Sequence, residues 1–134
     1  MALAASTNAH GQHPPSDSAE ISRMVRDASR AIQAGNAASF LNYFERDEFA
    51  DFPTLRSHVT ALASQRQIAS SIEITELENS GDGYELRVSW ILQLTYTGDP
   101  GPVESRRESV ACSVRKFGKS WKIVHLEPVL LFRP

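Results

Sequence analysis

The chain has 134 residues, a length that suits a single domain. Its formal net charge is −2 and its basic residues are scattered, so it offers no basic face for nucleic acid. The single cysteine, Cys112, excludes an intrachain disulfide, and no apolar run reaches the roughly 18–20 residues of a membrane helix.

Residues 1–16 are small and polar without periodicity, so we predict a disordered tail before a domain over residues 17–134. Residues 2–4 (Ala-Leu-Ala) have the pattern of a signal-peptide cleavage site, but a basic segment and a longer apolar stretch are missing. Two interpretations stay open, an ordinary start or the remnant of an export signal, and with them a cytoplasmic or an exported location. His10 and His13 lie in this tail without a third ligand, so we expect no metal site.

The next part of the chain predicts three helices. Asp17 begins the first, and Gly35 is a good signal for its end. Its apolar positions recur at helical spacing: Ile21, Met24, Val25, Ala28, Ala31 and Ile32. Asn36 is expected to cap a short second helix, and Asp51 with Pro53 predicts the start of a third.

From Ser70 onwards the apolar pattern alternates, which predicts strands. Turn signals at residues 79–83, 98–102 and 117–120 separate four of them. One face of the clearest strand is apolar throughout: Tyr84, Leu86, Val88, Trp90, Leu92, Leu94 and Tyr96. Three N-terminal helices followed by this meander predict an α+β fold, with the helices packed on a curved four-stranded antiparallel sheet.

The order of these elements, together with the hairpin Gly118-x-x-Trp121-Lys122-Ile123-Val124, resembles the NTF2-like superfamily over residues 17–132. This superfamily includes SnoaL-like and DUF4440-like proteins, ketosteroid isomerase and scytalone dehydratase. The ending of the chain is most similar to bacterial members with Pro- and Phe-containing tails. The resemblance implies a cone-shaped fold with a pocket between helices and sheet, and commonly a homodimer through the sheet. It implies no single function, because one fold hosts many.

An isomerase or dehydratase of this kind needs a carboxylate or a histidine inside an apolar pocket, where burial raises the pKa of a carboxyl group. The catalytic candidates are His125, Glu127 and Asp51. His125 and Glu127 share strand parity with Trp121 and Ile123, so we expect both to point into the cone.

Each candidate also has a structural interpretation. Asp51 is explained by helix capping, His125 by a structural position at the end of a strand, and Glu127 by an ion pair with an arginine at 106 or 107. The apolar face of the strand at 84–96 carries no acidic residue, which favours a non-catalytic domain.

The sequence also predicts a ligand pocket and a dimer interface. Residues expected to line a pocket for an apolar ligand, with core packing as the alternative, are Phe40, Tyr43, Phe44, Trp90, Leu92, Cys112 and His125. Small or weakly polar residues on the opposite sheet face predict a homodimer interface at Ser89, Ile91, Gln93, Ser109, Ala111 and Ser113. No zinc, P-loop or Rossmann motif is present, so we expect no cofactor.

The preferred function is a dimeric, non-catalytic domain that binds a small apolar ligand in its cone. Two alternatives stay open. The first is a cofactor-independent isomerase or lyase that uses His125 with a carboxylate. The second is a protein-assembly module.

Overall fold

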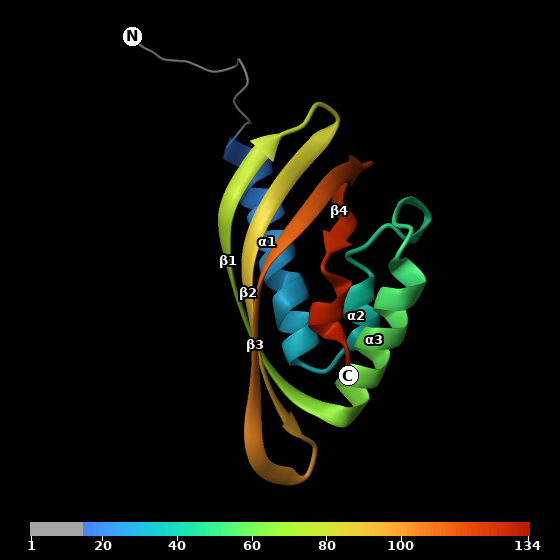
Figure 1. Cartoon of the computed structure of the whole chain (residues 1–134). Helices are drawn as coiled ribbons and strands as arrows, with labels where there is room; N and C mark the ends of the chain where they lie inside the picture. Colours follow the sequence, from blue (N-terminus) through green and yellow to red (C-terminus); the bar gives the residue numbers. More distant parts are fainter. Residues whose placement is uncertain (1–14) are drawn as a thin grey trace.

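The computed structural model describes residues 15–134, so the tail predicted at the N-terminus lies almost entirely outside the described residues, as do His10 and His13. Three α-helices precede four strands (Figure 1). The elements are α1 (Pro15–Gln33), α2 (Ala37–Leu41), η2 (Arg46–Glu48), α3 (Phe52–Gln65), β1 (Arg66–Asn79), β2 (Gly83–Tyr96), β3 (Asp99–Phe117), β4 (Ser120–Glu127) and η3 (Val129–Phe132). Within residues 15–134, no helix is both long and apolar enough to cross a membrane.

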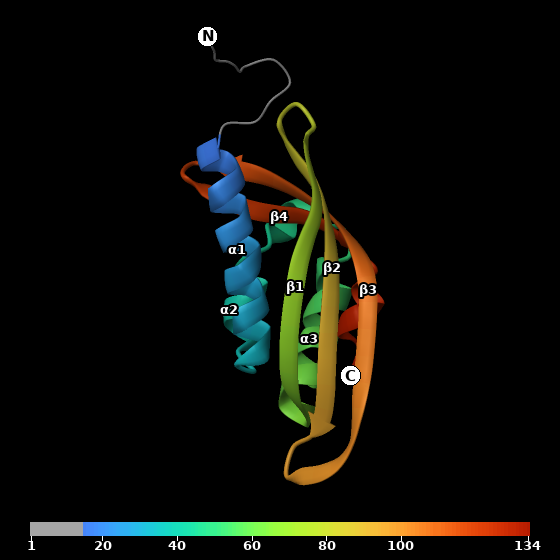
Figure 2. The ribbon, with the colours of Figure 1, turned by 90° about the vertical axis from the view of Figure 1, so that its left-hand side faces the viewer.

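The strands form one antiparallel meander in the order β1-β2-β3-β4, and the helices lie on one face of it (Figures 1 and 2). This confirms the predicted α+β fold. Strands β1 to β3 run side by side, whereas β4 bends across toward α1 (Figure 2). The cone-shaped core lies between the sheet and the helices, where the apolar stripe of α1, Phe40 of α2 and the buried residues of α3 form one cluster with the inner sheet face.

Most helix boundaries follow the predicted signals, but α1 begins at Pro15, two residues before the predicted start at Asp17. Gly35 has φ 73° and follows the last turn of α1, where the amide of Asn36 donates to the carbonyl of Ala31. Asn36 then caps α2, because its Oδ1 accepts from the amide of Ser39 at 3.0 Å. Asp51 occupies the N-cap position of α3, as predicted, but its side chain is exposed and makes no capping hydrogen bond.

The inner face of β2 is buried from Tyr84 to Leu94, as the alternating pattern predicted. Tyr96 departs from the pattern and is 56% exposed. The pairing of β2 with β3 shifts between Leu94 and Tyr96 because β3 carries the extra residues, whereas β2 stays in register with β1 to Tyr96. Tyr96 therefore keeps its inward parity at the edge of the core, and the Arg66 guanidinium lies 4.0 Å from its ring.

A second irregularity lies in β4. Ser113 pairs with His125, but the next residue of β3, Val114, pairs with Ile123. Val124 is therefore an extra residue in β4, a β-bulge that reverses the side-chain alternation beyond it. Leu126 consequently faces the core, where it is fully buried.

After Glu127 the chain turns back and η3 closes the cone. Leu131 and Phe132 are buried, and the Phe132 ring lies 5.3 Å from that of Trp90 and 5.2 Å from that of Phe40. These edge-on and tilted contacts are the arrangements that aromatic rings prefer. The end of the chain thus contributes a central part of the core.

Arg106, which is buried on the inner face of β3, holds this segment in place. Its Nη1 donates to the carbonyl oxygens of Leu131 at 2.9 Å and Arg133 at 2.6 Å. Its Nε donates to Glu104 at 2.8 Å, and the other oxygen of Glu104 accepts from the buried Arg66 at 3.0 Å. Hydrogen bonds from Arg106 and Arg66 lower the pKa of Glu104 against the opposing effect of desolvation.

Replacing Glu104 with glutamine should lower the free energy of unfolding by about 1–2 kcal/mol at pH 7, because two buried guanidinium groups lose their counter-charge. The native pKa of Glu104 lies below its usual value, so its contribution is present above the unfolded-state pKa and is lost as the pH falls through the native pKa. Urea unfolding should therefore show a difference between wild type and Glu104→Gln that shrinks below about pH 4.

Glu108→Gln, at an exposed position of the same strand, is the matched control and should change stability little. A Glu104→Gln effect of equal size at pH 7 and pH 3 would contradict the assignment.

Candidate functional site

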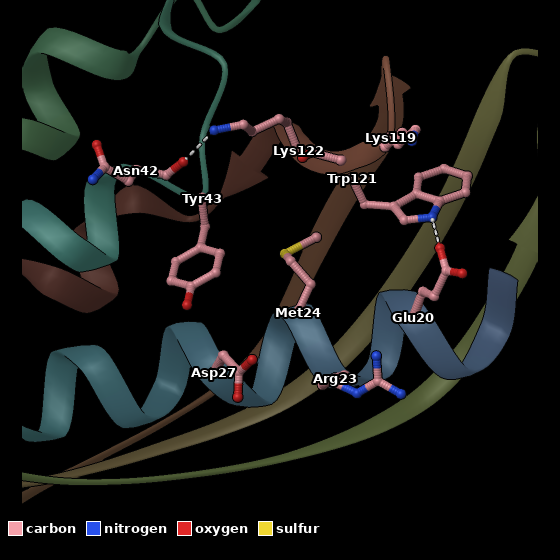
Figure 3. A pocket seen from close by; sticks show the side chains of 10 residues that line it. Glu20, Arg23, Met24, Asp27, Asn42, Tyr43, Lys119, Trp121 and Lys122 are labelled. Atoms are coloured by element: carbon pink, nitrogen blue, oxygen red, sulfur yellow. Dashed lines mark hydrogen bonds between the residues drawn. The ribbon is translucent and has the colours of Figure 1, made fainter. Parts of the chain in front are cut away.

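An open cleft of about 430 Å³ lies between α1 and the β3–β4 hairpin, next to the end of α2 (Figure 3). The residues that line it come from three separate segments. They are Glu20, Arg23, Met24 and Asp27 of α1, Asn42 and Tyr43 after α2, and Lys119, Ser120, Trp121 and Lys122 of the hairpin and β4. The cleft has the size of ordinary small-molecule sites, which span about 300–1,000 Å³.

Helix α1 provides one wall through helical spacing. Positions 20, 23, 24 and 27 are three or four residues apart, which places their side chains on one helix face. Met24 is only 8% exposed, so its thioether lies at the base of the cleft, whereas Glu20 and Arg23 lie nearer to solvent.

Trp121 forms the facing wall. Its indole Nε1 donates to Oε1 of Glu20 at 3.1 Å, and its ring meets that of Tyr84 edge-on at 5.5 Å. These two contacts fix the half-buried indole between α1 and the sheet, so the cleft has a rigid aromatic side.

The segment after α2 forms the third side by pairing with the free edge of β4. The amide of Ile123 donates to the carbonyl of Tyr43 at 2.8 Å, and the amide of Glu45 donates to the carbonyl of Ile123 at 2.9 Å. Lys122 Nζ also donates to the carbonyl of Asn42 at 2.6 Å. The half-buried ring of Tyr43 consequently points toward α1 across the cleft (Figure 3).

Of the residues predicted to line a ligand pocket, five lie in the packed core, Tyr43 lines the cleft and His125 lies on the outer sheet face. Phe40, Trp90, Leu92 and Cys112 are at most 1% exposed, and Phe44 packs beside Phe40 with its ring at 5.2 Å. Only Tyr43 of the predicted set lines the cleft.

His125 and Glu127 do not point into the cone, so the predicted direction of both side chains is wrong. The bulge at Val124 reverses their parity and places them opposite Ser113 and Ala111, on the outer sheet face. His125 Nε2 lies 2.8 Å from Oε1 of Glu127, and the side chains are 43% and 66% exposed.

The third catalytic candidate, Asp51, is exposed at the start of α3, and none of the three lines the cleft. The ring of His125 meets the buried ring of Phe49 edge-on at 5.8 Å, which packs it against the protein surface. The ion pair expected between Glu127 and Arg106 or Arg107 does not form: Glu127 lies opposite Ala111 and pairs with His125, while Arg106 binds Glu104.

The six residues of the predicted dimer interface all lie on the outer sheet face. The register pairs Ser89 with Ser109, and Ser113 donates to Glu85 on the neighbouring strand at 2.7 Å. Arg87 and Arg107 alternate with these small residues, so the face carries more charge than the prediction assumed. A hollow of about 460 Å³ beside Ile91 and Gln93 interrupts it.

Sequence reasoning overlooked most of the cleft. The sequence pattern places Met24 in the apolar stripe of the first helix and gives the polar residues beside it no role in a site. The available signal was the triplet Glu20, Arg23 and Asp27, which follows one edge of the apolar stripe at helical spacing. Only the three-dimensional structure shows that Trp121 faces this edge.

Several solved structures share this fold at low sequence identity. The chain aligns with a conserved protein from Planctomyces limnophilus at a TM-score of 0.73 and 10% identity, covering 84% of this chain and 94% of that one. A scytalone dehydratase-like protein from Novosphingobium aromaticivorans aligns at 0.72 and 14%, covering 83% and 81%. A protein with a cystatin-like fold from Nostoc punctiforme aligns at 0.56 and 17%, covering 84% and 90%.

Neither a protein-family model nor a curated protein sequence matches the chain. The fold is therefore NTF2-like, as the resemblance in the sequence implied. Identities this low show the fold alone, so the site must be interpreted from its own residues.

Cys112, the single cysteine, provides a direct test of the packed core. Burial, assisted by the negative charge of Glu85, raises the pKa of its thiol to about 12. We expect no reaction with a disulfide reagent at pH 8 in the native protein and complete reaction in denaturant, measured by thiolate release. Rapid modification of the folded protein would show that the space around Cys112 is open.

Proposed function

We propose that this chain is a small-molecule-binding domain whose ligand occupies the cleft between α1 and the β3–β4 hairpin. The observation that carries the proposal is an open cavity of about 430 Å³ with an apolar base at Met24 and aromatic sides at Tyr43 and Trp121. Apolar walls with a few polar groups at the rim are typical of such sites.

The interior of the cone is the less favourable place for a ligand. Phe132 packs between Trp90 and Phe40, and all three rings are fully buried. A ligand there would have to displace η3 and break the hydrogen bonds of Arg106. The cleft requires no such rearrangement.

The proposal gives His125 and Glu127 no part in chemistry on the bound ligand. Their hydrogen-bonded pair lies on the outer sheet face, and neither residue lines the cleft. A general acid or base must come within hydrogen-bonding reach of its substrate. We therefore favour binding over catalysis by this pair.

Binding in the cleft can be followed at Met24, since the chain holds only two methionines. In protein labelled with ¹³C at the methionine methyl groups, a ligand of the cleft should shift the Met24 signal, which Met24→Leu identifies. Tyr43→Ala should weaken binding roughly tenfold, because it removes an aromatic wall.

Tyr96→Ala removes an exposed tyrosine that lies on the far end of the sheet and should leave binding unchanged. Suitable probes are small aromatic compounds and any molecule that native mass spectrometry finds on the purified protein. A bound compound that leaves the Met24 methyl signal in place would contradict the proposed location.

The domain also pairs with a second copy through the outer sheet face. Small residues at Ser89, Ser109 and Ala111, with half-buried Ile91, give β2 and β3 a surface that another sheet can approach closely. Arg87 and Arg107 flank this patch, so further positive charge between them would oppose pairing.

Light scattering at micromolar concentration should give twice the chain mass of 14.8 kDa. Ser109→Arg should shift the protein to monomers, because it places a third guanidinium beside Arg87 and Arg107 at the centre of the face. Ser57→Arg, on the exposed surface of α3, adds the same charge and should leave the dimer intact. A monomeric wild-type protein would overturn this part of the proposal.

A further inference from the structure

We infer that the cleft selects ligands that combine a flat aromatic body with one anionic group. This inference rests on the proposed function and adds the chemical class of the ligand. It follows from the charges around the cleft, where three cations, Arg23, Lys119 and Lys122, face two carboxylates, Glu20 and Asp27.

Both carboxylates already have donors. Glu20 accepts from the indole of Trp121 at 3.1 Å, and Oδ1 of Asp27 forms an ion pair with Nη1 of Arg30 at 2.7 Å. These contacts occupy part of the hydrogen-bonding capacity of both carboxylates, so Glu20 and Asp27 attract a cationic ligand less strongly than free carboxylates would. A ligand that places positive charge here would also meet the three neighbouring cations.

The three cations make fewer hydrogen bonds and ion pairs within the protein than the two carboxylates do. Arg23 and Lys119 are exposed at the rim, and neither side chain makes a hydrogen bond or ion pair with any residue of the described part of the chain. Lys122 donates to the carbonyl of Asn42, a neutral acceptor, and an ammonium group has three donors. Unmatched positive charge at the rim thus favours an anionic group on the ligand.

The interior of the cleft determines the rest of the ligand. The Tyr43 ring and the Trp121 indole come from different segments, and the Met24 thioether lies at the base near both (Figure 3). Aromatic and thioether groups make favourable contacts with flat rings. A ring inserted toward Met24 leaves its anionic substituent at the rim, near Arg23 and Lys119.

Three probes that share the naphthalene ring test this charge preference: 2-naphthoate, the neutral 2-naphthamide and the cationic 2-naphthylmethylamine. Titration of the full chain, followed at the Met24 methyl signal, should give the tightest binding for the naphthoate and the weakest for the amine. Because the cations are solvent-exposed, we expect the naphthoate to bind about twofold to fivefold more tightly than the amide for each cation engaged.

Arg23→Gln and Lys119→Gln should each remove that advantage, weakening the naphthoate about twofold to fivefold and leaving the amide unchanged. Arg26→Gln is the matched control. It removes the same charge from the same helix at an exposed position, but Arg26 lines the groove against β1 and should have no effect on either probe.

The possible failures are distinguishable. If the naphthoate and the amide bind equally, or if Arg23→Gln and Arg26→Gln act alike, the cleft binds ligands but the charge selection is wrong. If no probe moves the Met24 signal, both the proposed function and this inference are overturned.

Discussion

The closed end of the cone depends on one guanidinium group, that of Arg106. A buried cation is costly unless it is paired and hydrogen-bonded, and Arg106 meets both conditions through Glu104 and two carbonyl groups of the C-terminal segment. The same bonds satisfy backbone oxygens that η3 would otherwise leave without donors. The charge of Arg106 and the position of Phe132 therefore depend on each other. Without Arg106 the carbonyl groups beside Phe132 lose their donor, and without this segment the buried guanidinium loses two acceptors.

This closure fills the interior of the cone with side chains. With Phe132 between Trp90 and Phe40, the cone interior is a packed core rather than a pocket. One open cleft lies instead beside the core, where β4 bends toward α1 (Figure 2) and Trp121 donates to Glu20. The NTF2-like fold thus keeps its helix–sheet layers, and the cleft beside Trp121 lies at their margin.

Local patterns were sufficient to predict most of the fold. The apolar stripe of α1, the cap at Asn36 and the alternation of β2 depend on neighbours within a few residues, and the structure confirms them. The η3 turn was not predictable, because Arg106 fixes it from 25 positions away in the chain. The cleft likewise depends on contacts such as Trp121 with Glu20, across 101 positions, which no local pattern reports.

The bulge at Val124 determines which side chains of β4 face the core and which face outward. Ile123 and Leu126 are three positions apart, yet both are fully buried, which uninterrupted strand alternation does not allow. That spacing was the available signal, but the alternation of Trp121, Ile123, His125 and Glu127 offered a simpler pattern. By absorbing one residue, the bulge lets Trp121 reach α1 while Leu126 stays opposite Cys112 in the core. The same bulge turns His125 outward, so the arrangement that brings Trp121 to the cleft also takes the predicted acid–base pair away from the interior of the cone.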